Sequence, residues 1–184
     1  MAELSRLLGP FNLQIFELLI TENASVRGLA KKTMCSPAKI TQFVDIYSKN
    51  KLITVEKNDN RKIIALNKSN PLVKEIITLI YTNKILGSRA FLSLKKASDS
   101  IGLYGSAVDG TVDKQSDIDL WIVSDSKKRI VEAGKLRQEF SKEIGREVSL
   151  KFFTPQDIQN LKQKDRIFYN ELENKSKILH GEGF

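Results

Sequence analysis

Two aspartates one residue apart, Asp117 and Asp119, are the residues of this sequence best suited to chemistry. They open the run DIDLWIV, which is typical of a strand, so both carboxylates should face the same side. Carboxylates about 6 to 7 Å apart along a strand can hold one or two divalent cations. Without a cation, each raises the pKa of the other. We therefore predict a Mg²⁺ or Mn²⁺ site, with a pair salt-bridged to lysines at a sheet edge as the structural alternative.

A short turn, Gly105-Ser106, precedes the aspartates and follows a predicted strand at 101–104. Glycine lets a phosphate approach the backbone closely, and Ser106 offers a hydroxyl and an amide at a helix N-terminus, where anions are favoured. A phosphate chain at this turn would lie beside a cation held by the aspartates. That is the arrangement required for phosphoryl-type transfer.

The spacing of these residues also carries a family resemblance. Gly105-Ser106, then Gly110, then Ser116-Asp117-Ile118-Asp119-Leu120 resembles the signature of the nucleotidyltransferase superfamily related to DNA polymerase beta, in its minimal prokaryotic and archaeal form. The resemblance covers about residues 85–184. It implies an α/β fold with a small mixed sheet flanked by helices, Mg²⁺ or Mn²⁺ as cofactor, and an NTP as substrate or ligand.

The resemblance further implies transfer of a nucleoside monophosphate to a protein or nucleic-acid acceptor. Gly105, Ser106 and Ser116 would bind the nucleotide, and Asp117 and Asp119 would be the metal ligands and catalytic carboxylates. The sequence contains neither a P-loop motif nor a dinucleotide-binding fingerprint.

One expected carboxylate is missing. Catalysing relatives carry a third one at the centre of a later strand, and the matching run REVSLKFFT has Ser149 there. A hydroxyl replaces a carboxylate neither as a base nor as a ligand of a second metal. Glu147, two residues earlier on the same face, is the tentative substitute. The alternative is a DNA-binding regulator whose impaired second domain senses a nucleotide without chemistry.

Positive charge near the turn is also sparse. Many relatives place arginines shortly after the Gly-Ser pair, where this chain has Ala107 and Asp109. We interpret Lys114, Lys151 and Arg166 as solvated surface charges, with an approach to the phosphates as the alternative.

The N-terminal part carries the whole basic excess of a chain with a net charge of +8. Residues 1–99 hold 16 Lys and Arg against 8 Asp and Glu, and residues 100–184 hold 14 against 14. This asymmetry predicts a polyanion as partner of the N-terminal part, with a merely solubilising surface as the alternative.

The elements predicted there form a familiar order. An amphipathic helix over 9–20 is followed by helices capped by Ser25 and by Ser36-Pro37, and then by two β-rich runs separated by Asn58, Asp59 and Asn60. Three helices and a β-hairpin resemble the winged-helix DNA-binding domains of prokaryotic regulators. We expect a winged helix at 1–70, a helical linker at 71–99 and a nucleotidyltransferase-like domain at 100–184.

This resemblance implies binding to double-stranded DNA, with the helix 37–49 in the major groove. A protein-docking or dimerising module is the alternative, and Asp45 on the outward face would repel phosphate. The predicted DNA contacts are Arg27, Lys31, Lys32, Lys39, Thr41, Gln42, Arg61 and Lys62.

The remaining segments are predicted to be mostly helical. In 71–99 an apolar row either pairs with its copy in a homodimer or packs on one domain; its members are Leu72, Ile76, Ile77 and Ile80. Single helices are expected at 126–144 and 166–179, the latter with Phe168, Leu172 and Ile178 in the core. A further helix is expected to start at the N-cap Thr154, with Pro155 as its first residue. Cys35 is the only cysteine, no apolar run would span a bilayer, and the start MAELSRLLGPF is unlike a signal peptide, so we expect a cytoplasmic protein.

Overall fold

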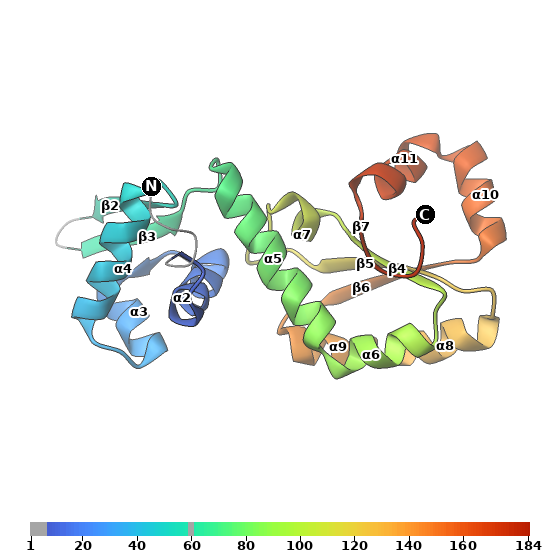
Figure 1. Ribbon diagram of the computed structural model, residues 1–184, viewed down its shortest axis with the longest axis horizontal. Helices are drawn as coiled ribbons and strands as arrows, with labels where there is room; N and C mark the ends of the chain where they lie inside the picture. The colour runs from blue at the N-terminus through green and yellow to red at the C-terminus, as the bar shows by residue number, and fades with distance from the viewer. Residues whose placement is uncertain (1–6, 59–60) are drawn as a thin grey trace. The chain divides into compact units, whose positions relative to one another are not determined.

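The computed structural model describes residues 7–58 and 61–184 (Figure 1). The chain divides into two compact units, and each is described by itself. The first unit comprises Met1–Ile80 with Asp113–Gln115, and the second comprises Tyr81–Val112 with Ser116–Phe184. The division falls inside a helix, and the boundaries at 70 and 99 remain a prediction.

Three helices open the first unit: α2 (Pro10–Thr21), α3 (Val26–Thr33) and α4 (Pro37–Lys49). Both predicted caps are confirmed. The Ser25 hydroxyl accepts a hydrogen bond from Gly28 N at 3.1 Å, and the Ser36 hydroxyl accepts one from Lys39 N at 3.3 Å. Because the Ser36 cap and Pro37 act locally, the start of α4 follows directly from the sequence.

The first unit also contains a three-stranded antiparallel sheet in the order β1-β3-β2, whose strands are β1 (Ala24–Ser25), β2 (Ile53–Asn58) and β3 (Arg61–Leu66). The predicted hairpin is formed by β2 and β3. Asp59 and Asn60 of its expected turn lie outside the described residues. β1 was not predicted, because two residues carry no periodic signal.

Aromatic packing closes this unit's core. Phe43 and Tyr47 of α4 stack at 4.0 Å between ring centres, and Phe16 of α2 lies 6.3 Å from Tyr47. The Tyr47 hydroxyl donates a hydrogen bond to the Leu7 carbonyl.

Helices α5 (Pro71–Gly87) and α6 (Arg89–Lys96) occupy the predicted linker. Ile76, Ile77 and Ile80 are buried within the chain, whereas Leu72 is 37% exposed. The isoleucines therefore pack in the fold, and the exposed apolar residues of α5 are Leu72, Leu79 and Leu86.

The second unit is built on a mixed sheet in the order β6-β5-β4-β7, in which β5 and β6 are parallel and the other pairs antiparallel. This confirms the predicted small mixed sheet flanked by helices. Figure 1 shows α10 and α11 on one side of the sheet and α6, α8 and α9 on the other. The strands are β4 (Ser100–Tyr104), β5 (Ile118–Val123), β6 (Val148–Phe153) and β7 (Lys177–His180).

Two helix predictions for this unit were wrong. The segment 126–144 forms two helices, α8 (Lys127–Lys135) and α9 (Arg137–Ile144). The helix is interrupted because Gly134 is a poor helix former and because the backbone N–H of Leu136 bonds three residues back, as in a 3₁₀ turn. The last helix, α11 (Arg166–Lys175), ends early, and the chain continues into β7, where Ile178 is 51% exposed. Pairing with β4 overrides the local helical spacing. The predicted start of α10 (Pro155–Lys164) at Thr154 is confirmed by a capping box with Asp157.

Within the part of the chain that the structure describes, no helix is both long enough and apolar enough to cross a bilayer.

Candidate functional site

The two aspartates lie at the start of β5. The strand begins at Ile118, one residue later than predicted, so Asp117 directly precedes it and Asp119 is its second residue. Asp117 is exposed and Asp119 half-buried, while the other residues of β5 are buried. A fully packed strand thus presents one carboxylate at its surface and a second just before it.

The Gly-Ser turn lies against Asp119. Gly105 has φ 69° and ψ −149°, a conformation that residues with a Cβ rarely adopt, and a Cβ built there would lie 3.0 Å from Asp119 Oδ2. Ser106 follows as the first residue of the short helix α7 (Ser106–Asp109) and is half-buried. The position therefore needs glycine for two reasons, and the structure brings the turn and Asp119 together.

Ser149 faces Asp119 from the neighbouring strand. The two residues are register partners in the parallel β5–β6 pair, and the Ser149 side chain hydrogen-bonds the Asp119 carboxyl group. Glu147 lies one residue before β6 and is exposed, and its backbone carbonyl accepts a hydrogen bond from Ile118 N at 2.9 Å. The strand position level with Asp119 thus carries a hydroxyl, and Glu147 lies before the strand.

Burial, followed by the negative charge of Asp117, raises the pKa of Asp119 above its ordinary value. The Ser149 hydrogen bond and the positive charge of Lys151 act in the opposite direction and do not cancel the rise. The ionised carboxylate is therefore under-compensated in the protein alone, which favours a cation at this position.

The segment that leads to Asp117 is held by Arg146. Ser116 is half-buried, and its carbonyl accepts a hydrogen bond from Arg146 Nη1 at 3.0 Å. Sequence reasoning missed Arg146, because a contact between residues 30 positions apart leaves no local signal.

Sequence reasoning did not place Tyr104 next to Asp119, and it interpreted Lys151 as a solvated surface charge. Tyr104, the register partner of Asp119 in β4, is buried, and its hydroxyl has no hydrogen-bond partner among residues 7–58 and 61–184. Burial, followed by the charges of Asp119 and Glu171, raises the pKa of this phenol. The Lys151 ammonium lies 5.9 Å from the centre of the Tyr104 ring and 4.4 Å from that of Phe168.

The predicted DNA-reading helix exposes the expected side chains. Lys39, Thr41 and Gln42 of α4 are exposed, and so is Asp45. The Thr41 hydroxyl donates to the Pro37 carbonyl at 3.0 Å, and the Lys39 ammonium lies 3.9 Å from the centre of the Phe11 ring.

The predicted phosphate contacts differ in their surroundings. Arg27, Lys31 and Lys62 are exposed, whereas Lys32 forms an ion pair with Glu22 that the sequence did not indicate. The side chain of Arg61 lies outside the described part of the structure.

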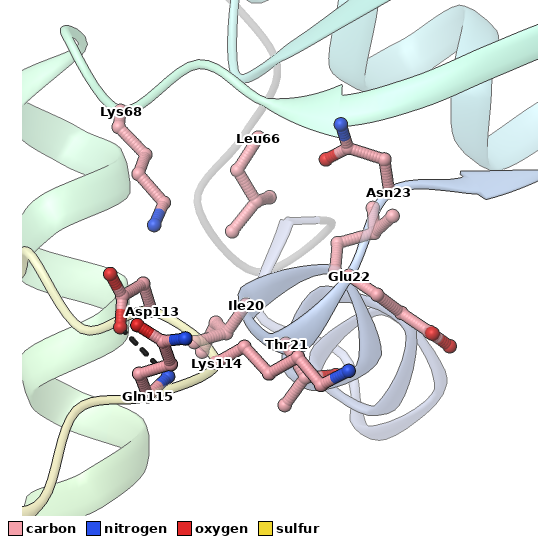
Figure 2. A pocket seen from close by; sticks show the side chains of 10 residues that line it. Ile20, Thr21, Glu22, Asn23, Leu66, Lys68, Asp113, Lys114 and Gln115 are labelled. Carbon is pink, nitrogen blue, oxygen red and sulfur yellow. Dashed lines mark hydrogen bonds between the residues drawn. The ribbon is translucent and has the colours of Figure 1, made fainter.

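A pocket of about 370 Å³ lies in the first unit, lined by residues from 19–23, 66, 68 and 113–115 (Figure 2). Within it the Gln115 backbone N–H donates to the Asp113 carboxylate at 2.9 Å. None of its lining residues belongs to the predicted nucleotide, metal or DNA contacts, so we assign it no role.

A family model described as polymerase beta, nucleotidyltransferase matches residues 89–182, slightly more than half of the chain. The chain belongs to this nucleotidyltransferase family. No curated protein matches the chain. Among solved structures, the crystal structure of NolR from Sinorhizobium fredii is similar at 21% identity, covering 42% of this chain and 75% of that one with a TM-score of 0.38. A likeness this limited carries no argument.

The donor set of the nucleotidyltransferase domain fits a magnesium ion. Mg²⁺ is usually bound through one or two carboxylates, with waters and substrate phosphates completing the shell. Asp117 and Asp119 provide such a pair, and burial, followed by the charge of Asp117, raises the pKa of Asp119. Among residues 7–58 and 61–184 no cluster of three or more acidic, histidine or cysteine side chains could hold a metal.

Proposed function

We propose that this protein is a cytoplasmic nucleotidyltransferase that transfers a nucleoside monophosphate from a metal-bound NTP to a protein or nucleic-acid acceptor, with pyrophosphate as the leaving group. The observation that carries this proposal is the Gly105 turn, whose φ of 69° favours glycine and where a Cβ would lie 3.0 Å from Asp119 Oδ2. A phosphate bound at the turn would lie beside the carboxylates that bind the metal. Membership of the nucleotidyltransferase family supports the same chemistry.

Each residue of the site has a proposed role. Asp117 and Asp119 hold Mg²⁺ or Mn²⁺, which when bound offsets phosphate charge and makes the reacting phosphorus more electrophilic. The turn at Gly105 and Ser106 binds the phosphate chain through its backbone and hydroxyl, and Ser116 contributes to nucleotide binding. Glu147 is the base that accepts a proton from the acceptor.

One observation favours a second function. Ser149 occupies the strand position beside Asp119, and its hydroxyl is hydrogen-bonded to that carboxyl group. A domain without a third carboxylate there could bind a metal–nucleotide complex and perform no transfer. The protein would then be a DNA-binding regulator that senses a nucleotide.

Label transfer separates the two functions. The purified protein is incubated with α-³²P-labelled ATP, GTP, CTP or UTP and Mg²⁺ or Mn²⁺, and label is sought on protein and on added nucleic acid. The control is the double variant Asp117→Asn, Asp119→Asn. Transfer that the control loses supports the enzyme, whereas metal-dependent nucleotide binding without transfer supports the regulator.

We further propose that the first unit is a winged helix that binds double-stranded DNA. The proposal is supported by the order of α2, α3, α4 and the β2–β3 hairpin, and by the exposed Lys39, Thr41 and Gln42 of α4. In this proposal α4 enters the major groove, and the basic residues of α3 and the hairpin contact phosphates. Arg27, Lys31, Lys32, Arg61 and Lys62 are these phosphate contacts.

A homodimer through residues 71–99 is the final element of the proposal. The exposed residues Leu72, Leu79 and Leu86 follow one another along α5 at intervals of seven, the spacing of a coiled-coil seam. Sedimentation velocity checks this: Leu79→Glu should convert a dimer to a monomer, and a wild-type monomer at all concentrations contradicts it.

A further inference from the structure

The candidate site is short of positive charge. A nucleoside triphosphate brings several negative charges to a place that already holds Asp117 and Asp119, and one divalent cation offsets only part of them. The turn from Gly105 to Gly110, GSAVDG, contains no lysine or arginine and adds the exposed Asp109. Stable binding of the phosphates therefore needs a cation from another element.

Strand β6 places a lysine where it is needed. Asp119 pairs with Ser149 and Trp121 with Lys151 in the parallel register, so Ser149 and Lys151 share the face of the sheet that carries Asp119. The positive charge of Lys151 acts on the Asp119 carboxyl group and partly offsets the rise in its pKa. Lys151 is thus the basic residue that the register aligns with the metal-binding carboxylate.

Aromatic rings hold this lysine in place. Its ammonium lies 4.4 Å from the centre of the Phe168 ring and 5.9 Å from that of Tyr104, within the range of cation–π attraction. Phe168 belongs to α11, and its backbone N–H donates to the Asp165 cap at 3.0 Å. Lys151 is exposed and forms no ion pair with a carboxylate in the described residues 7–58 and 61–184. A positioned, unneutralised ammonium beside Asp119 is well suited to an anionic ligand.

We infer that Lys151 binds the phosphate chain of the nucleotide, donating hydrogen bonds to its non-bridging oxygens, with Phe168 and Tyr104 positioning the ammonium. This inference rests on the proposed function, in which the second unit binds an NTP. It assigns to β6 and α11 a share of the substrate contacts that the Gly-Ser turn leaves unmet.

The chain offers a matched control on the same sheet. Lys177 of β7 is also exposed, but it pairs with Leu103, whose side chain points to the opposite face from that of Tyr104. Removing its charge changes the net charge of the protein by the same amount without touching the Asp119 face.

The test is isothermal titration calorimetry with the full chain and Mg²⁺. The NTP that binds wild type most tightly is titrated, followed by the corresponding NDP and NMP. Variants are Lys151→Met, Lys151→Arg, Lys177→Met and the double variant Asp117→Asn, Asp119→Asn. We expect Lys151→Met to raise the Kd for the NTP about 10- to 100-fold, the loss of one charge-assisted hydrogen-bonding group.

Three comparisons distinguish phosphate binding by Lys151 from a purely structural role. The effect of Lys151→Met should shrink from NTP to NDP to NMP, a trend that a purely structural role would not produce. Lys151→Arg should recover most of the affinity, and Lys177→Met should bind like wild type. Circular dichroism melting verifies that each variant is folded.

The two proposals fail in different ways. If wild type binds the NTP in a metal-dependent manner that the double aspartate variant loses, but Lys151→Met binds equally well, only the inference about Lys151 is overturned. If wild type shows no metal-dependent binding, the proposed function is overturned and the inference with it.

Discussion

Opposing electrostatic effects act on the pKa of Asp119. Burial and the charge of Asp117 raise its pKa, and the Ser149 hydrogen bond and Lys151 lower it without cancelling the rise. The folded protein therefore holds a proton on this carboxyl group more tightly than the unfolded chain does. Because a bound cation favours the ionised form, proton and metal compete for the same oxygen atoms.

This competition predicts a pH dependence of stability. A raised folded-state pKa means that the folded state binds more protons than the unfolded state between the two pKa values. In metal-free buffer, the free energy of unfolding should fall as the pH rises through the window between an ordinary aspartate pKa and the raised pKa of Asp119. Urea denaturation at a series of pH values with a chelator present measures it.

The variant Asp119→Asn is the control, because it should lose this part of the pH dependence. Adding Mg²⁺ above the window should recover stability in wild type and have no effect in the variant. A wild-type profile that is flat or rises with pH through the window, and that the variant reproduces, would contradict the structure's account of Asp119.

Two tyrosines provide a test of hydrogen bonding at the same scale. Both are buried, but the Tyr47 hydroxyl donates to the Leu7 carbonyl, whereas that of Tyr104 has no partner within the described residues. Tyr47→Phe should lower the free energy of unfolding by about 1 kcal/mol, and Tyr104→Phe should leave it unchanged or raise it by about 1 kcal/mol, since a buried unpaired group is costly. Chemical denaturation of both variants measures this, and equal losses would be the opposing result.

The parallel pairing of β5 and β6 determines which residue lies beside Asp119. A residue in place of Ser149 stands directly beside Asp119 on the neighbouring strand, at the usual strand spacing of about 4.8 Å. Ser149→Asp should therefore create a third carboxylate within reach of the same metal–nucleotide complex. We expect label transfer to rise at least about tenfold, which is less than the usual contribution of a general base, about 10²- to 10⁴-fold.

The same variant should be less stable without metal, because Asp119 exchanges a hydrogen bond for a like charge. Ser149→Ala controls for loss of the hydroxyl alone. If Ser149→Asp and Ser149→Ala transfer label equally, the absent carboxylate is not what limits the chemistry.

The sequence predicts those elements whose signals are local. Ser36-Pro37 indicated the start of α4 and Thr154 the start of α10, because a cap is decided within four residues. The strands β1 and β7 were not predicted, because each forms only through pairing with a strand that is distant in the sequence. Strand alternation puts Ser149 and Lys151 of β6 on one face, and the parallel register shows that this is the face of Asp119.

At the scale of the whole molecule, the charge is unevenly distributed. Residues 1–99 carry all of the basic excess, and Arg27, Lys31 and Lys62 are exposed there. If the first unit binds duplex DNA through phosphates, affinity must fall steeply with salt, since each neutralised phosphate adds about 0.9 to the slope of log K against log salt concentration.

The double variant Lys31→Ala, Lys62→Ala should accordingly bind DNA more weakly and reduce that slope by about 2. Fluorescence anisotropy with labelled duplexes over a range of salt concentrations provides the measurement. Lys177→Ala, in the second unit, is the matched control and should keep the wild-type slope. An affinity for duplexes that is negligible even at low salt would instead favour a protein-docking role.

Trp121 is the only tryptophan of the chain, and it is fully buried in β5, two residues from Asp119. Its indole N–H donates to the Ser176 hydroxyl at 2.8 Å, and its ring contacts that of Phe184 at 5.3 Å between centres. The aromatic absorption of the first unit comes from phenylalanines and Tyr47, which are transparent at 295 nm. Light of that wavelength therefore excites the second unit alone, and its emission spectrum can follow the melting of this unit, or the arrival of a ligand at Asp119, without labelling the protein.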